Sequence, residues 1–279
     1  MKAIQDLYQP GIIERVPAVA RYCLFTLADP GIDAVAIKEA LTRLSPLANG
    51  SDVVVGIGPS LVQALGCEIP NLHEFPDDLS GHGVKVPSTP GTLWCWIRGD
   101  DLGNLLHLTR KVQKALKPAF VLRHVMEGFR HSWSDTGFGK DLTGFEDGTE
   151  NPKGDDALAA AFTQGQGEGL DGASFVAVQQ WVHDLDAFEE LGDQERDFHI
   201  GRRMTDNEEL EDAPETSHVK RTAQESFDPE AFVLRRSMPW LHSMQAGLMF
   251  VAFGKSHQAF EQQIRRMAGH DDGITDAMF

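Results

Sequence analysis

Apolar segments with strand character alternate with single amphipathic helical segments along this chain, and this alternation limits its fold more than any other feature. In the first half, each predicted helix lies between two predicted strands. The predicted strands cover 17–27, 52–58, 92–99 and 119–130, and the predicted helices cover 33–44, 59–66 and 102–117. A polar, Gly- and Pro-rich loop covers roughly 68–91. The first half therefore reads as an α+β unit made of two strand–helix–strand passes.

A second set of strands and helices begins after the turn-rich segment 131–156. The predicted strands are 173–185, 231–240 and 248–254, and the predicted helices are 186–201 and 257–269. Strands joined by single helices are typical of the split βαβ unit of ferredoxin-like folds. The sequence therefore predicts an α+β protein of two ferredoxin-like halves with antiparallel sheets, which cover 1–145 and 146–279.

Composition and charge narrow the kind of partner. The chain of 279 residues has a formal net charge of −17, which argues against binding nucleic acid or anionic membranes through a general electrostatic field. Its three cysteines, Cys23, Cys67 and Cys95, form no C-x-x-C pair, which favours a reducing cytoplasm. The N-terminal stretch has no apolar export core, and no apolar run approaches the ~18 residues of a membrane span. We expect a cytoplasmic protein with no nucleic acid and no membrane as partner.

Two segments partly match known ligand-binding motifs, but each lacks a residue that its motif requires. The segment VVVGIGPS (53–60) resembles a dinucleotide-binding turn, but Leu61 stands where the third glycine belongs. The acids from Asp147 onward suggest a calcium loop, but an EF-hand needs glycine at its sixth position, and Pro152 stands there. We therefore expect neither a nucleotide site nor a calcium site at these places.

An aspartate and a histidine in predicted turns, together with an arginine on a predicted strand, form a candidate site. Asp147 is followed by Gly148 in GFEDGTENP (144–152), a segment rich in turn formers. His218 lies in PETSHVKR (214–221), shortly before the apolar strand segment that carries Arg235. An arginine on such a strand is costly to bury unless an anion or carboxylate accompanies it. Taken singly, each of these residues also has an ordinary structural explanation.

The order of several motifs resembles the bacterial class B branch of the dye-decolorizing peroxidase family. GFEDGTENP resembles the G-x-x-D-G signature of that family and its continuation, and the resemblance extends over essentially the whole chain. The further motifs, in order, are IGRRMTDNEEL (200–210), SHVKR (217–221), VLRRSMPW (233–240), GLMFVAFG (247–254) and RRMAGHDDGITDAMF (265–279). The resemblance implies haem b, held mainly by the C-terminal half.

By motif, the resemblance implies a role for five residues. His218 matches the proximal iron ligand, Asp147 the distal carboxylate, and Arg235 the distal arginine that also contacts the cofactor. Ser237 falls where the family often has a small polar residue over the haem, and Arg202 resembles a haem-propionate partner. A ligating histidine needs an acceptor for its other ring nitrogen. The resemblance favours Asp276 for this, with Asp271 and Asp272 as alternatives.

The implied activity is a peroxidase that reduces hydrogen peroxide through a ferryl intermediate and oxidises dyes, phenols or similar one-electron donors. Small aromatic reductants are the expected partners, and ferredoxin-like sheets favour a homodimer or larger homo-oligomer. A haem-handling protein for iron release or storage is the alternative function, and a pocket without haem is a third. Simple haem binding needs no pair like Asp147 and Arg235, so the residues of the distal side distinguish a peroxidase from a haem-handling protein.

The family often has a further C-terminal segment and sometimes a tail that directs the enzyme to an encapsulin shell. This sequence stops at Phe279, so either a terminal piece is missing or this branch is short, and the residues given do not support shell loading.

Overall fold

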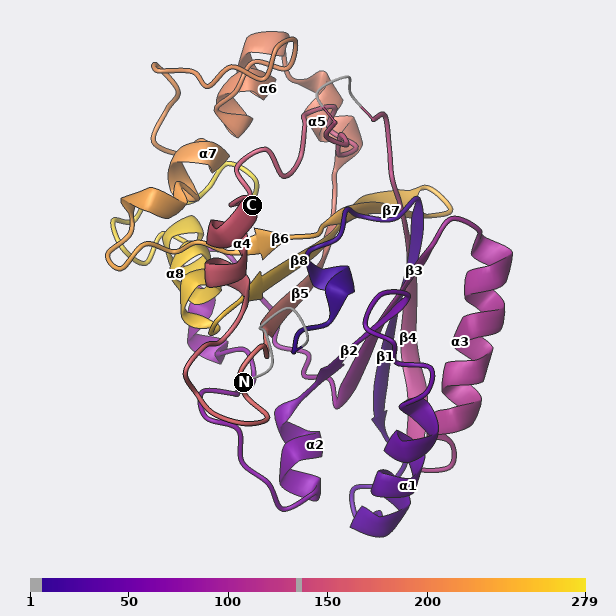
Figure 1. Cartoon of the computed structure of the whole chain (residues 1–279). Coiled ribbons are helices and arrows are strands. Elements are labelled where there is room, and N and C mark those ends of the chain that lie inside the picture. Colours follow the sequence, from indigo (N-terminus) through magenta and orange to yellow (C-terminus); the bar gives the residue numbers. More distant parts are fainter. Residues whose placement is uncertain (1–6, 134–136) are drawn as a thin grey trace. The chain divides into compact units, whose positions relative to one another are not determined.

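The computed structural model describes residues 7–133 and 137–279, which divide into two compact units (Figure 1). Unit 1 comprises 1–74, 89–130 and 162–174, and unit 2 comprises 75–88, 131–161 and 175–279. Each unit thus includes one segment from the other half of the chain, 162–174 in unit 1 and 75–88 in unit 2. The division into halves at residue 145 stays a prediction. Within the described residues, no helix is long and apolar enough to cross a membrane.

Unit 1 is a four-stranded antiparallel sheet with helices packed on one face. The strands run in the order β2-β3-β1-β4, which is the order of a ferredoxin-like split βαβ unit. Their bounds are β1 (Val19–Leu27), β2 (Val53–Ile57), β3 (Leu93–Gly99) and β4 (Phe120–Phe129). The helices are α1 (Ala34–Leu44), α2 (Pro59–Ala64) and α3 (Leu102–Leu116), with a short 3₁₀ turn η2 (Pro10–Ile12).

Burial and capping explain why these segments fold as the sequence predicts. Cys23 and Phe25 of β1 and Ile97 of β3 are fully buried in one cluster, together with Ile37 of α1 and Val112 of α3. Each strand therefore contributes alternate residues to the helix-covered face.

Both long helices begin at an aspartate N-cap. The side chain of Asp33 accepts a hydrogen bond from the N–H of Val35 at 3.0 Å, and Asp101 accepts from Asn104 at 2.8 Å. These caps fix the starts of α1 and α3, which were predicted to within a residue.

Unit 2 has an antiparallel sheet in the order β7-β8-β5, and the short strand β6 also pairs with β8. The strands are β5 (Phe175–Val182), β6 (Leu234–Arg235), β7 (Met238–His242) and β8 (Gln245–Gly254). The helices are α4 (Gly154–Ala161), α5 (Leu185–Glu190), α6 (Asp193–Ile200), α7 (His218–Arg221) and α8 (Gln258–Met267), with 3₁₀ turns η3 (Asp77–Leu79) and η4 (Gln224–Ser226). The expected α+β class with antiparallel sheets is confirmed.

Unit 2 departs from the sequence prediction at two breaks. The helix predicted over 186–201 is two helices, because the chain is extended at Leu191 and Gly192 before α6 begins. The strand predicted over 231–240 is interrupted after Arg235, where β6 ends and β7 starts at Met238. Helix α4 begins within the last residues of the turn-rich segment, continues to Ala161, and was not predicted.

Candidate functional site

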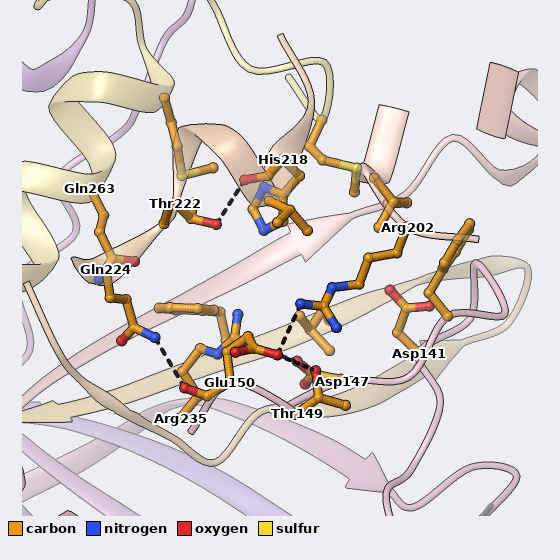
Figure 2. Close-up of a pocket in the computed structure, with 18 of the residues that line it drawn as sticks. Asp141, Asp147, Thr149, Glu150, Arg202, His218, Thr222, Gln224, Arg235 and Gln263 are labelled. Atoms are coloured by element: carbon orange, nitrogen blue, oxygen red, sulfur yellow. Dashed lines mark hydrogen bonds and ion pairs between the residues drawn. The ribbon is translucent and has the colours of Figure 1, made fainter. Parts of the chain in front are cut away.

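One pocket lies wholly within unit 2 and is lined by both apolar and charged side chains. Figure 2 labels ten of its polar and charged residues. Gln179 and Trp181 of β5 line it, because every second side chain of a strand points to the same face, and His183, the first residue after β5, lines it too. The remaining apolar lining comes mainly from β8 and α8, as Leu248, Phe250, Phe260, Ile264 and Met267. The charged side comes from the loop 141–150 and from Arg202 and Arg235.

His218 is the first residue of α7, and its ring is held by a buried carboxylate. Its Nδ1 lies 2.8 Å from Oδ2 of Asp276, which is 2% exposed. The other oxygen of Asp276 accepts from the N–H of Met278 at 2.9 Å. With Nδ1 engaged as the donor, Nε2 is the nitrogen left to face the pocket that His218 lines.

The expected partner of His218 is thereby confirmed as Asp276. The two alternatives are engaged elsewhere. Asp272 pairs with Arg221 at 2.7 Å, and Asp271 lies 3.6 Å from Arg266. The Arg221 guanidinium and backbone hydrogen bonding hold the pKa of Asp272 below its usual value.

The motif loop is a series of turns that ends against β6. Gly148 has φ +83°, a left-handed conformation that suits glycine, and a Cβ there would meet Nδ2 of Asn151 at 3.0 Å. The N–H of Asp147 donates to the carbonyl of Gly139 at 2.9 Å. The side-chain Oδ1 of Asn151 accepts from the N–H of Arg235 at 2.6 Å, and its Nδ2 donates to the Arg235 carbonyl at 3.1 Å. The loop is therefore tied to the strand that carries the arginine.

Asp147 and Arg235 come together as the sequence analysis expected. Nη2 of Arg235 lies 3.8 Å from Oδ1 of Asp147, and both side chains line the pocket. Nε of Arg235 is buried, and no hydrogen-bond partner for it is found among the described residues. A buried guanidinium nitrogen without an acceptor leaves an unsatisfied demand for an anionic or polar group at this place.

Arg202 also reaches the pocket, where two glutamates hold it. Its Nη2 donates to Oε1 of Glu150 at 2.9 Å and to Oε2 of Glu209 at 3.1 Å, and Figure 2 shows the bond to Glu150. Its Nη1 donates to the carbonyl of Asn207 at 3.3 Å. A propionate partner at this position would have to share Arg202 with these carboxylates.

Ser237 lies in the break between β6 and β7 and is buried. Its hydroxyl oxygen accepts a hydrogen bond from the N–H of Val251 on β8 at 3.3 Å. Of the five residues expected at the site, four line the pocket: Asp147, Arg202, His218 and Arg235. Ser237 is not among the pocket-lining residues of the described chain, and its catalytic role stays a prediction.

Among the other titratable residues that line the pocket, Asp141 and His183 have shifted pKa values, and neither was expected at the site from the sequence. Burial, reinforced by the nearby charge of Asp147, raises the pKa of Asp141 to about 6, against the hydrogen bonds from Thr143. Burial lowers the pKa of His183, so its imidazole is held neutral. The two-residue spacing of Gln179 and Trp181 on β5 and His183 directly after it is the signal that would have placed His183 here.

Comparison with known proteins agrees with this geometry. Residues 9–130 match the family described as Dyp-type peroxidase, N-terminal, and residues 139–279 match Dyp-type peroxidase, C-terminal. The dye-decolorizing peroxidase of Mycobacterium tuberculosis (strain ATCC 25618 / H37Rv) is 30% identical over 290 residues, which cover 96% of this chain and 84% of the relative. That of Rhodococcus erythropolis (strain PR4 / NBRC 100887) is 30% identical over 295 residues, which cover 98% and 84%.

Solved structures of the same family share the fold. The dye-decolorizing protein from V. cholerae aligns with a TM-score of 0.81 at 26% identity, covering 97% of this chain and 91% of that one. A variant of DypB from Rhodococcus jostii RHA1, in complex with heme, aligns with a TM-score of 0.80 at 27% identity, covering 94% and 89%. The expected fold of two ferredoxin-like halves and the resemblance stated from the motifs are both confirmed. The chain belongs to the Dyp-type peroxidase family.

Proposed function

We propose that this protein is a haem b peroxidase that reduces hydrogen peroxide and oxidises dyes, phenols or similar one-electron donors at the pocket of unit 2. The observation that carries the proposal is the pairing of Asp147 with Arg235 in the same pocket as His218. A haem-handling protein would need the histidine but not this pair. The peroxidase is therefore favoured over iron release or storage.

The residues present fit a haem. His218 offers Nε2 to the pocket while Asp276 occupies Nδ1, which is the usual arrangement of a metal-binding imidazole and its carboxylate partner. The apolar lining suits a porphyrin, and the buried Nε of Arg235 finds no acceptor within the part of the chain that the structure describes. We assign His218 as the iron ligand, Arg235 and Arg202 as cofactor contacts, and Arg202 in particular as the propionate partner.

When bound, haem supplies an iron that takes up peroxide and stores the two oxidising equivalents that donors later remove singly. Asp147 would accept a proton from hydrogen peroxide and return it to the oxygen that leaves as water. Arg235 would stabilise negative charge on that leaving oxygen. Asp276 keeps the proton of His218 on Nδ1 and raises the basicity of Nε2. Ser237 is included in the proposed catalytic set from its motif alone, since it is not among the described residues that line the pocket.

Stopped-flow mixing of the haem-loaded protein with hydrogen peroxide tests the assignment. We expect Arg235→Leu and Asp147→Ala each to slow the Soret change by about 10²- to 10³-fold. Arg203→Leu is a matched control, because Arg203 pairs with Asp206 and Glu208 and does not line the pocket. Wild-type rates in both distal variants would overturn the peroxidase mechanism and favour haem handling.

We further infer a cytoplasmic homodimer or larger homo-oligomer. All three cysteines are free thiols, and Cys67 is exposed, which suits a reducing compartment. Size-exclusion chromatography with light scattering measures the oligomeric state, and a monomer at micromolar concentration would contradict the inference.

A further inference from the structure

The charges that line the pocket are predominantly negative. Two guanidinium groups, Arg202 and Arg235, face six carboxylates, so the lining carries four more negative than positive side chains, and no lysine is among the described residues that line it. The six carboxylates are Asp141, Glu146, Asp147, Glu150, Glu209 and Glu225.

The arginine side chains of the pocket are more buried than several of its carboxylates. The side chain of Arg202 is 12% exposed, whereas its partners Glu150 and Glu209 are each 59% exposed. Glu225, on η4, is also exposed. We name the exposed carboxylates Glu150, Glu209 and Glu225 the acidic mouth. The side chain of Arg235 is 20% exposed, so both arginines are less accessible to solvent than these carboxylates.

The long-range field has the same sign as the mouth. The whole chain carries a formal net charge of −17. Charges of one sign around an opening raise the local concentration of oppositely charged small molecules and repel those of like charge. Arg202 is paired with two glutamates, and Arg235 lies 3.8 Å from Asp147, so each positive charge of the lining has a carboxylate beside it.

We propose that this pocket selects cationic aromatic donors over anionic ones. The proposal rests on the peroxidase function and names its substrate class: phenols or aromatic amines that carry an ammonium group. The overall reaction with a phenol is one hydrogen peroxide and two phenols giving two waters and two phenoxyl radicals. Each phenol loses one electron and one proton, and peroxide is the oxidant.

The test compares kcat/KM for three phenols of similar shape: tyramine, which is cationic, 4-hydroxyphenylacetate, which is anionic, and neutral 4-ethylphenol. At neutral pH and ~10 mM ionic strength we expect tyramine to exceed 4-hydroxyphenylacetate by about three- to tenfold. The ratio should fall toward one at ~1 M salt, where the Debye length is about 3 Å. A ratio near one at low salt, or a preference for the anion, would overturn the proposal.

A charge-reversal pair separates the mouth from the overall charge. Glu225→Lys and Glu190→Lys change the net charge equally, but Glu190 is an exposed residue of α5 that does not line the pocket. We expect Glu225→Lys to lower the tyramine to 4-hydroxyphenylacetate ratio severalfold and Glu190→Lys to leave it within twofold. Equal shifts in both variants would overturn the role of the mouth.

The neutral donor 4-ethylphenol distinguishes failure of the peroxidase function from failure of the charge selection. If haem binds but peroxide oxidises none of the three phenols, the peroxidase function itself fails. If 4-ethylphenol is oxidised and the two charged phenols react equally, the function stands and only the charge selection fails.

Discussion

The carboxamide of Asn151 hydrogen-bonds to both main-chain polar groups of Arg235, at 2.6 Å to its N–H and 3.1 Å to its carbonyl. Asn151 thereby continues the backbone pairing of β6 with a side chain and joins the loop of Asp147 to the strand of Arg235. The approach of Asp147 to Arg235 at 3.8 Å depends on this connection between segments 84 residues apart. We regard Asn151 as a positioning residue, since it touches the arginine backbone rather than the reacting atoms.

Asn151→Ala should leave the N–H and carbonyl of Arg235 without these partners and let the loop move away from β6. We expect about 1–3 kcal/mol of lost stability, because polar groups are left unsatisfied, and a slower Soret change with peroxide. Asn151→Asp should be partly rescued, because its carboxylate accepts from the Arg235 N–H but cannot donate to the carbonyl. Urea unfolding and stopped-flow mixing measure the two effects. An unchanged peroxide rate in Asn151→Ala would refute the positioning role.

His218→Ala should abolish or greatly weaken haem binding while the protein stays folded, because the imidazole is the direct bond between iron and chain. Titration with haem, followed at the Soret band, measures the loss, and circular dichroism monitors the fold. His183→Ala is the matched control, since His183 lines the same pocket and is held neutral by burial. A full, unshifted Soret band in His218→Ala would mean that another residue binds the iron.

Asp276→Asn should weaken the hold on the His218 ring without removing side-chain volume. The amide carries no negative charge to polarise Nδ1–H, so we expect haem affinity to fall about 10- to 100-fold and the iron reduction potential to rise. Spectroelectrochemical titration reports the potential, which a purely structural role would not move. Asp271→Asn serves as the control, because Asp271 lies near Arg266 instead. Equal potentials in wild type and Asp276→Asn would contradict a tuning role.

Patterns of neighbouring residues explain why most of the fold was predictable. Asp33 and Asp101 are the N-caps that mark the starts of α1 and α3, and the regular spacing of apolar residues indicates how far these helices extend. The interruption between Arg235 and Met238 has no comparable signal, because it depends on pairing with β8 and on the Asn151 contact. The extended residues before α6 likewise interrupt a segment whose composition is helical throughout.

The site was predictable in its residues more than in its connections. The motifs placed His218, Asp147 and Arg235, but the contact between His218 and Asp276 spans 58 residues and required the fold to select among three late aspartates. The role of Asp141 could not be predicted, since its unusual environment comes from burial and from the charge of Asp147 rather than from a local pattern. Burial by residues that are distant in the sequence cannot be read from a single sequence.

The buried Asp141 predicts how the stability of the fold changes with pH. Burial and the Asp147 charge raise the folded-state pKa of Asp141 to about 6, above the ~3.9 of an unfolded aspartate. The folded protein therefore holds this proton more tightly. Ionisation of Asp141 begins to destabilise the fold as pH rises above about 4, and the full penalty is present above about pH 6.

Asp141→Asn removes that penalty while its Oδ1 still accepts the hydrogen bonds that Thr143 donates from its N–H and hydroxyl at 2.9 and 2.5 Å. The variant should be more stable than wild type above pH ~6.5, by on the order of 1–3 kcal/mol, and equal to it near pH ~4. Urea midpoints of the haem-loaded proteins at both pH values measure the difference. Asp155→Asn, at an exposed position on α4, should show no such dependence. A gain that is the same at both pH values would show that charge burial at Asp141 is not its cause.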